Sequence, residues 1–372
     1  MKLIYLTNAR IPTEKAHGIQ IMKMAEAFAK IGVELELVIP RRFNWIKKDP
    51  FEYYGVERNF KITKLPCLDL IPLDKYIGIL GLWVESISFI FFAFPYVLFK
   101  KADTVYTRDK FFLPLSLLKK NIIFEAHSIS RNHFLYSLLL KKIRGAVVTA
   151  QNLKDFFVKN GMPAKRIIVV PNGVDLEKFQ IAKSKFQIRE ELALPQDKKI
   201  VLYAGHLYEW KGVQTLAEAS QHLPEDIKVY FVGGTERDVE KFKTKNLKLK
   251  INVVGYRSHD EIPLWLKAAD VLVLPDSAKG DPLKYGASPL KMFEYMASKR
   301  PIVASDLSSI TEVLGKDNAV LVKPDNPELL AQGINEILQN PQLSDKISER
   351  AFQDVQNHAW EKRAQKILEY DW

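Results

Sequence analysis

The sequence has a single cysteine, Cys67, so the chain can form neither an intramolecular disulfide nor a zinc site built from several cysteines. This scarcity favours a reducing compartment, and we expect a cytoplasmic protein. Two nucleotide-binding signatures, G-x-G-x-x-G and G-x-x-x-x-G-K-[ST], are also missing, which argues against NAD- and ATP-dependent chemistry. Because no helix-turn-helix, RNP or zinc-finger pattern is present either, we expect no nucleic-acid partner.

Negative charge is scarce in the first half of the chain. Residues 1–170 contain 27 Lys and Arg against 14 Asp and Glu, whereas the remaining residues contain 28 against 30. Such a one-sided field attracts anions such as acidic phospholipids or phosphorylated substrates. A general contribution to solubility is the alternative interpretation.

Short apolar runs rich in valine and isoleucine recur along the chain, each followed by a helix-like segment. Continuous apolar strands that alternate with helices predict parallel sheets covered on both faces. Their two series, together with a length of 372 residues, predict two domains that meet near residues 172–199. The predicted strands are 3–6, 34–39, 104–107, 122–125, 146–149 and 167–170, then 200–204, 228–232, 252–254, 271–274, 302–304 and 320–322.

One apolar segment, residues 76–99, is long enough to span a bilayer. Glu85 and Pro95 interrupt it, and a carboxylate in mid-membrane costs roughly 2.5–3.5 kcal/mol on insertion scales. A predicted strand also follows it immediately. We therefore expect a helix that is buried or lies on a membrane surface rather than a spanning helix.

Several predicted strands lead into helix starts that suit an anion. The helix at 19–30 follows Gly18, and Lys211 precedes the helix at 213–220. Ser288 is a suitable N-cap and Pro289 a suitable first helical residue of a third helix. Free backbone N–H groups and the helix dipole favour phosphate at such positions. Glu294, about one turn into the third helix, is placed to accept hydrogen bonds from ribose hydroxyls.

Together these motifs resemble the family-4 retaining glycosyltransferases, and the likeness covers nearly the whole chain. The motifs that carry it are 170–175 (VPNGVD), Gly205 with Lys211 and Gly212, 269–275 (ADVLVLP), 288–297 (SPLKMFEYMA), 301–305 (PIVAS) and 360–363 (WEKR). The resemblance implies the GT-B fold, which consists of two facing, doubly wound Rossmann-like α/β domains and a C-terminal helix that crosses back to the first. We expect residues 1–171, completed by 360–372, to form a basic acceptor-binding domain, and residues 172–359 to form the nucleotide-sugar-binding domain.

The resemblance also implies roles for individual residues. It makes His127, Lys211 and Glu294 the catalytic residues, with His127 facing the transferred sugar. It assigns donor binding to Gly18, His206, Lys211, Ser288, Pro289, Leu290, Lys291 and Glu294. It implies no bound metal and no cofactor other than the donor itself, most simply a UDP- or GDP-linked sugar.

Three positions depart from the family pattern. His17 stands where a second glycine is common, His206 where an arginine is common, and Gly286 where the first of two paired glutamates is common. A histidine is a weaker, pH-dependent cation than an arginine, so more of the phosphate binding falls to Lys211. The missing glutamate leaves the donor sugar open.

These observations predict an enzyme that transfers a sugar, with retention, from a nucleotide diphospho-sugar to a glycan or lipid-linked acceptor. Its basic first half would place it on the anionic cytoplasmic face of a membrane. The alternatives are an inactive membrane-associated GT-B scaffold, a sugar-nucleotide 2-epimerase and, more remotely, a phosphorylase.

Overall fold

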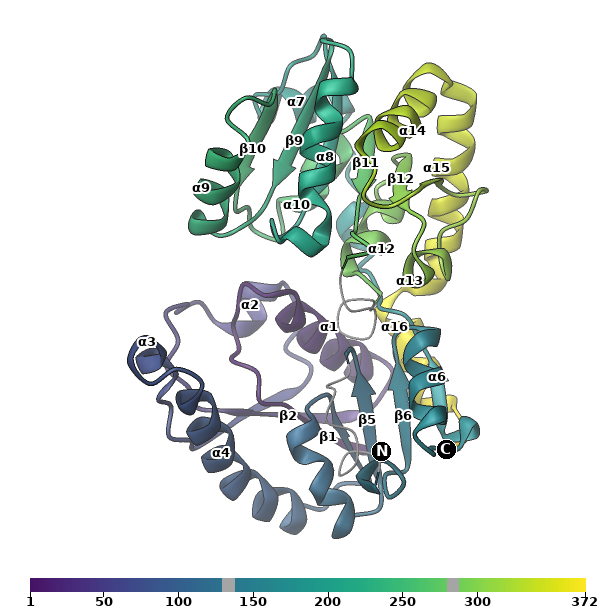
Figure 1. Ribbon diagram of the computed structural model, residues 1–372. Helices are drawn as coiled ribbons and strands as arrows, with labels where there is room; N and C mark the ends of the chain where they lie inside the picture. The colour runs from purple at the N-terminus through teal and green to yellow at the C-terminus, as the bar shows by residue number, and fades with distance from the viewer. Residues whose placement is uncertain (129–137, 280–287) are drawn as a thin grey trace. The chain divides into compact units, whose positions relative to one another are not determined.

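The structure, a computed structural model, describes residues 1–128, 138–279 and 288–372. It divides into two compact units, residues 1–172 with 360–372 and residues 173–359. The expected boundary lay after residue 171, so Asn172 is the one residue placed differently. We describe each unit separately, with the labels of Figure 1.

Unit 1 is built on a seven-stranded parallel sheet with the order β3-β2-β1-β4-β5-β6-β7. This is the doubly wound arrangement, in which the chain reverses direction across the sheet between β1 and β4. The strands are β1 Lys2–Leu6, β2 Glu34–Pro40, β3 Lys61–Leu65, β4 Thr104–Thr107, β5 Ile122–Ala126, β6 Gly145–Val148 and β7 Ile167–Val169.

The edge strand β3 is absent from the predicted set. Its sequence, KITKL, contains two lysines and a threonine, two of its five residues are exposed, and none is fully buried. It therefore lacks the continuous apolar run by which the other strands were recognised, as expected for an edge that faces water on one side.

The helices of unit 1 are α1 Ala16–Lys30, α2 Pro50–Tyr54, α3 Asp74–Ile77, α4 Leu80–Phe99, α6 Gln151–Lys159 and α16 Trp360–Glu369. Helix α1 starts three residues earlier than predicted, so Gly18 lies in its first turn rather than before it. Helix α16 packs against α1, although more than 300 residues separate them in the sequence. The C-terminal helix thus completes the first unit, as expected.

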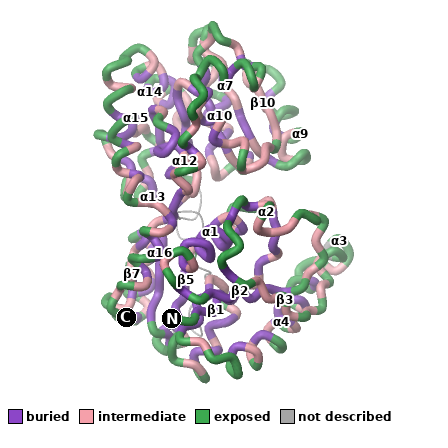
Figure 2. The backbone as a smooth tube through the Cα atoms, turned by 180° about the vertical axis from the view of Figure 1, so that it is seen from behind, coloured by how far each residue is buried: buried purple, intermediate pink, exposed green. Residues whose placement is uncertain are grey.

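Helix α4 connects β3 to β4 and is partly buried. Glu85, Phe89, Ala93 and Val97 recur every four residues and form its buried side. By length and composition α4 is the one described helix that could cross a membrane. Figure 2 shows exposed and intermediate residues along α4. Its exposed large apolar residues are Leu80, Leu82, Trp83, Ile87, Phe91, Phe92, Leu98 and Phe99.

Unit 2 contains a six-stranded parallel sheet with the order β10-β9-β8-β11-β12-β13, which is again doubly wound. Its strands are β8 Lys199–Ala204, β9 Ile227–Val232, β10 Ile251–Gly255, β11 Val271–Leu274, β12 Ile302–Ser305 and β13 Val320–Val322. All six lie within one residue of the predicted ranges.

Two apolar clusters, one on each face of this sheet, hold its helices in place. The first packs α10 and α12 on strand residues such as Leu202 and Leu272, and the second packs α8 and α14 on Val201 and Val303. The helices are α7 Lys185–Glu191, α8 Val213–Ala219, α9 Glu236–Lys245, α10 Ile262–Ala268, α12 Leu290–Ala297, α13 Ser308–Thr311, α14 Pro327–Gln339 and α15 Pro341–Val355.

Candidate functional site

In unit 2 the predicted donor residues gather where the strand order reverses, between β8 and β11. The loops after these two strands begin at Gly205 and Pro275, and a backbone hydrogen bond of 3.1 Å from Ser277 N to Trp210 O joins them. Ligands of doubly wound sheets bind outside the carboxyl ends of the strands at this reversal. The topology thus singles out one edge of the sheet as the candidate site.

Lys211 lies at this edge, at the end of a 3-10 turn, Glu209–Lys211. Its Nζ lies 3.1 Å from Oδ2 of Asp276, a buried residue of the facing loop, and 4.0 Å from the centre of the Trp210 ring. The following residue, Gly212, has φ +64°, and a Cβ there would lie 1.7 Å from the carbonyl oxygen of Pro275. The two loops therefore meet so closely that only glycine fits, and the contact fixes Lys211 against Asp276.

Lys291, in the first turn of α12, brings a second amine to this edge. Its Nζ is buried, lies 3.8 Å from the centre of the Tyr203 ring and has no hydrogen-bond partner among the residues that the structure describes. Burial, and then the charge of Lys211, lower its pKa to about 7. An unpartnered buried amine is costly, and an anion bound at this edge would satisfy it.

Gly205 and His206 follow β8 directly. Gly205 has φ +140°, and a Cβ there would lie 2.8 Å from Nζ of Lys291, so this glycine leaves room for the amine. The His206 ring stacks on Tyr208 at 4.9 Å with an angle of 4° between the ring planes, and its carbonyl accepts a hydrogen bond from Tyr203. The His206 ring is thus held against an aromatic side chain of the loop that follows β8.

Glu294 lies one turn further along α12, where the sequence places it. Its Oε1 is 2.8 Å from Nε2 of His259, a residue of the loop after β10 that the sequence did not single out. Both side chains are mostly buried, with 16% and 25% of their surface exposed. The predicted ribose-binding carboxylate thus has a protein partner already.

The start of α12 differs from the prediction. Pro289, with φ −75° and ψ 132°, is the N-cap and lies outside the helix, which begins at Leu290. Ser288 is therefore the residue before the cap. Extended backbone is favoured at this position, because Ser288 precedes a proline. Ser288 is nevertheless buried, and Leu290 and Lys291 open the helix at the candidate site.

In unit 1, His127 directly follows β5. Its Nε2 lies 3.0 Å from Oε1 of the buried Glu125, outside the direction of a well-aligned hydrogen bond. Burial, and next the charge of Arg108, lower the pKa of His127 to about 4. The imidazole is therefore neutral near pH 7.

Glu125 lies at the centre of a buried polar network. Its carboxylate accepts hydrogen bonds from Arg363 Nη2 at 2.6 Å, Gln20 Nε2 at 2.9 Å and the Tyr106 hydroxyl at 2.8 Å. Burial alone would raise the pKa of Glu125, but the Arg363 guanidinium, followed by His127, holds it well below its usual range. Arg363 comes from α16, so the C-terminal helix supplies the cation that keeps Glu125 ionised beneath His127.

Gly18 packs against its own unit. A Cβ at this position would lie 2.1 Å from the Tyr54 hydroxyl and 2.7 Å from Thr13, and Tyr54 is hydrogen-bonded to the backbone of Thr13. The N–H of Gly18 donates to the carbonyl of Lys15 at 2.9 Å. The structure thus explains the glycine by close packing, and its own amide is already engaged.

The reversal point of unit 1 lies between β1 and β4, and Asp109 joins the ends of these strands. Its carboxylate accepts from the Thr7 hydroxyl at 2.7 Å and from Asn8 N at 2.8 Å. The neighbouring Arg108 hydrogen-bonds Gln20, which in turn bonds Glu125. The charge of Arg108 also contributes, after burial, to lowering the pKa of His17 to about 3.

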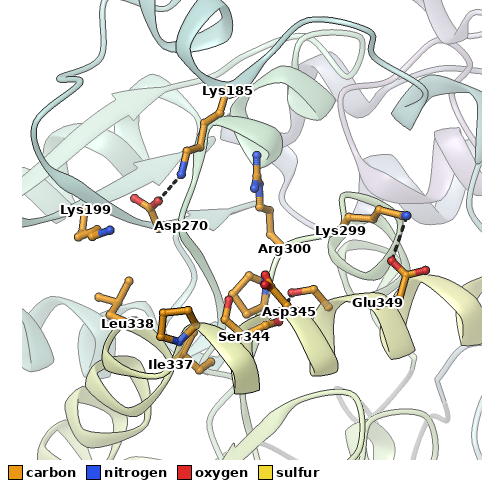
Figure 3. A pocket seen from close by; sticks show the side chains of 13 residues that line it. Lys185, Lys199, Asp270, Lys299, Arg300, Ile337, Leu338, Ser344, Asp345 and Glu349 are labelled. Carbon is orange, nitrogen blue, oxygen red and sulfur yellow. Dashed lines mark hydrogen bonds and ion pairs between the residues drawn. The ribbon is translucent and has the colours of Figure 1, made fainter.

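A cavity of about 470 Å³ lies at the opposite edge of the unit 2 sheet, where β8, β11 and β12 begin (Figure 3). Two of its lysines are paired: Lys185 lies 2.7 Å from Asp270, and Lys299 lies 3.1 Å from Glu349. Arg300 donates to the carbonyl of Lys267. The cavity contains no predicted site residue, and these cations already have partners.

Comparison with known proteins matches part of the chain to a known family. Residues 184–354, which contain the whole unit 2 site, match the family described as glycosyl transferases group 1. The chain carries a glycosyltransferase group 1 domain. The match confirms the resemblance found in the sequence for residues 184–354, and it places Lys211, Lys291, Glu294, Asp276 and His259 inside the group 1 domain.

Two curated relatives illustrate the likeness. TuaC of Bacillus subtilis, a glycosyltransferase named for teichuronic acid biosynthesis, is 31% identical over 186 residues, which cover 49% of this chain and 45% of TuaC. An uncharacterized glycosyltransferase of Methanocaldococcus jannaschii is 25% identical over 82% of each chain. The alignment thus spans about half the length of TuaC and most of the archaeal protein.

Among solved structures, HepE of Anabaena in complex with UDP-glucose superposes with a TM-score of 0.76. The match covers 99% of this chain and 98% of HepE at 17% identity, so it concerns the fold alone. The predicted GT-B fold class is confirmed.

Two expectations, the glycine at position 286 and the absence of a bound metal ion, involve residues that the structure does not describe. Gly286, where a paired glutamate is common in the family, belongs to residues 280–287 and is outside the described residues. In the parts of the chain that the structure describes, no group of three or more His, Cys, Asp and Glu side chains could hold a metal ion.

Proposed function

We propose that the protein is a retaining glycosyltransferase that uses a nucleotide diphospho-sugar, with unit 2 binding the donor and unit 1 the acceptor. The observation that carries the proposal is the pair of amines at the β8–β11 reversal. Lys291 is buried and unpartnered among the described residues, Lys211 lies at the same edge, and the pKa of Lys291 responds to the charge of Lys211. The charges of the two amines repel each other, as the lowered pKa of Lys291 reflects, and a bound diphosphate would relieve both the repulsion and the desolvation.

The neighbouring residues extend this site to the rest of a nucleotide. Glu294, 2.8 Å from His259, offers a carboxylate to the ribose hydroxyls. His206, Ser288, Pro289 and Leu290 complete the predicted donor set around the lysines. A uridine or guanosine base is the expected nucleoside, and the UDP-glucose complex of the similarly folded HepE supports testing uridine first.

The proposed reaction breaks the bond between the sugar's anomeric carbon and the diphosphate and forms one from that carbon to an acceptor oxygen. The departing phosphate takes the acceptor's proton. Lys211 and Lys291 stabilise the charge that develops on the leaving diphosphate, and we propose that they do so without a metal ion. His127, kept neutral by its surroundings, contacts the transferred sugar without adding a positive charge to an oxocarbenium-like centre.

The acceptor, in this proposal, is a glycan or lipid-linked sugar at the cytoplasmic face of a membrane. The exposed apolar side of α4 is the supporting feature, because it presents residues such as Trp83, Ile87 and Phe91 to solvent. Exposed lysines, Lys75 before α4 and Lys101 and Lys110 after it, lie close to it in the sequence. Apolar insertion combined with lysines fits an anionic bilayer surface, where each cation contributes about 1 kcal/mol.

Thermal unfolding with candidate ligands tests the donor proposal. We expect UDP or GDP, and the matching sugar conjugate, to stabilise the protein by about 2.7 kcal/mol at a hundred times the Kd, with NAD and ATP inactive. Lys291→Met should abolish the shift, whereas Lys199→Met, at the opposite edge of the same sheet, should preserve it. A wild-type protein that responds to none of the nucleotides, and releases no nucleoside diphosphate from any sugar donor, would instead support the inactive scaffold.

Vesicle sedimentation tests the membrane proposal. Binding to vesicles with 30 mol% anionic lipid should exceed binding to neutral vesicles and should weaken between about 0.05 and 0.5 M salt, because salt screens the lysines. The variant Trp83→Ser/Phe91→Ser should reduce binding, whereas Phe186→Ser, an exposed aromatic of unit 2, should not. Equal binding of all three proteins would remove α4 from the proposal.

A further inference from the structure

His259 is held in place by a tightly closed turn after β10. Ser258 donates from both its backbone N and its hydroxyl to the Glu261 carboxylate, at 2.9 and 2.7 Å, and Glu261 N donates back to the carbonyl of Ser258 at 3.0 Å. The next residue, Asp260, pairs with Lys178 at 2.6 Å. The backbone on both sides of His259 is therefore anchored, which fixes where its ring can reach.

The partner of His259 is anchored as firmly. Glu294 belongs to α12, whose residues Phe293 and Tyr295 are fully buried on either side of it, and the Tyr295 hydroxyl accepts a hydrogen bond from Ala204 N at 2.8 Å. An ionised carboxylate can only accept, so Nε2 of His259 donates to Oε1 of Glu294 in the 2.8 Å contact. The other oxygen, Oε2, has no hydrogen-bond partner among the described residues and remains available to a ligand.

Lys291 is a second possible partner for Glu294, and it would compete with His259. It lies three residues before Glu294 on the same helix, and the charge of Glu294 acts on its amine. Without His259, the Glu294 carboxylate could pair instead with the buried ammonium of Lys291. That pairing would take both groups from a ligand, the carboxylate from a hydroxyl and the ammonium from a phosphate.

We propose that His259 is a positioning residue of the donor site, which holds the Glu294 carboxylate toward the ribose hydroxyls and away from Lys291. The proposal rests on the proposed function, because it assumes that unit 2 binds a nucleoside diphosphate. It predicts that recognition of the ribose 2′-hydroxyl depends on His259 as much as on Glu294.

Calorimetric titration with UDP and 2′-deoxy-UDP, and in parallel with GDP and 2′-deoxy-GDP, tests this. The wild type should prefer the ribonucleotide by about 10- to 100-fold, the range expected for a hydrogen bond to a charged group. His259→Leu and Glu294→Gln should each lose most of that preference while binding the deoxynucleotide nearly as the wild type does. The double variant should lose no more than either single variant, since both act on one contact.

Two further variants separate positioning from folding. His259→Gln keeps an N–H donor at similar reach and should retain most of the preference. His222→Leu replaces a half-exposed histidine far along the chain in the same unit and should behave as the wild type. If His259→Leu keeps the full preference, or weakens UDP and 2′-deoxy-UDP equally, the inference is wrong. If the wild type binds none of the four nucleotides, the proposed function itself fails.

Discussion

Replacing Arg363 by methionine removes the cation beneath Glu125 but retains a side chain of similar length. Arg363 and Glu125 are 1% and 0% exposed, and their charged atoms lie 2.6 Å apart. The guanidinium also donates to the carbonyl of Pro171 at 2.8 Å. In the Arg363→Met variant the buried carboxylate keeps its neutral donors, His127 and the charge of Arg108 but loses the guanidinium bound to it, so the free energy of unfolding should fall.

The size of the fall follows from the burial of the pair. Removing one partner of a fully buried ion pair costs about 3–5 kcal/mol, because the remaining charge is left in a medium of low polarity. The double variant Arg363→Met/Glu125→Leu replaces both charges by apolar groups and should recover most of the loss, since buried pairs contribute little over well-packed apolar residues.

The loss of unfolding free energy in Arg363→Met should depend on pH. In the wild type the pKa of Glu125 is held well below its usual range. The ion pair with Arg363 therefore stabilises the protein at pH values above the ordinary carboxyl pKa range, and this stabilisation is lost as the pH falls below that range. Without Arg363 burial dominates and raises the pKa of Glu125, and protonation then relieves the cost. The deficit of Arg363→Met relative to the wild type should therefore be larger at pH 7.5 than at pH 5.

Urea unfolding of both proteins at the two pH values measures these differences. Lys366→Met, an exposed position on α16, is the matched control and should change the unfolding free energy by less than about 0.5 kcal/mol. An Arg363→Met protein that resembled this control, or that showed the same deficit at pH 5 and pH 7.5, would refute this electrostatic role of Arg363.

Three further predictions concern the donor site. Lys211→Ala and Glu294→Ala should each lower kcat/KM by about 100-fold or more in a nucleotide-release assay, with circular dichroism unchanged, since each removes a charged contact to the donor; near-wild-type turnover would remove these roles. Because the pKa of Lys291 is lowered to about 7, its amine is charged below that pH and neutral above it, and UDP affinity should fall about tenfold from pH 7 to pH 8.5. The Lys291→Met variant should lack this dependence, and a wild type with a flat profile would contradict it. Gly212→Ala should destabilise the protein by about 1–3 kcal/mol in urea unfolding, because φ is +64° and the Cβ would meet the Pro275 carbonyl; a neutral effect would show that the two loops can separate.

The sequence predicts the strands of this fold well where they are buried on both faces. All six strands of unit 2 are recognisable as apolar runs, because a parallel sheet covered on both sides has no polar face. Strand β3 was not predicted because two of its five residues are exposed, so it has no continuous apolar run. Helix starts are predicted less accurately: α1 begins at Ala16 instead of residue 19, and Pro289 is the N-cap of α12 instead of its first residue.

The sequence predicts the charged residues of the donor site but not the residues that pair with the charged side chains. Lys211, Lys291 and Glu294 stand in local motifs that a sequence shows directly. Asp276, His259 and Arg363 act on residues 65, 35 and 238 positions away, and no local pattern indicates such contacts. The partners become visible only when the sheet topology brings the strand ends together.

Helix α16 imposes an order on synthesis. Unit 2 is one continuous stretch, residues 173–359, whereas unit 1 is completed by residues 360–372. A nascent chain of 359 residues would contain all of unit 2 and all of the unit 1 sheet, yet Glu125 would lack Arg363 and Gly145 would lack its close neighbour Trp372. Since domains fold as units, unit 1 cannot be completed before all of unit 2 has been synthesised. The half of the protein that is made first is therefore the half that finishes last, and the emergence of α16 is the event that completes it.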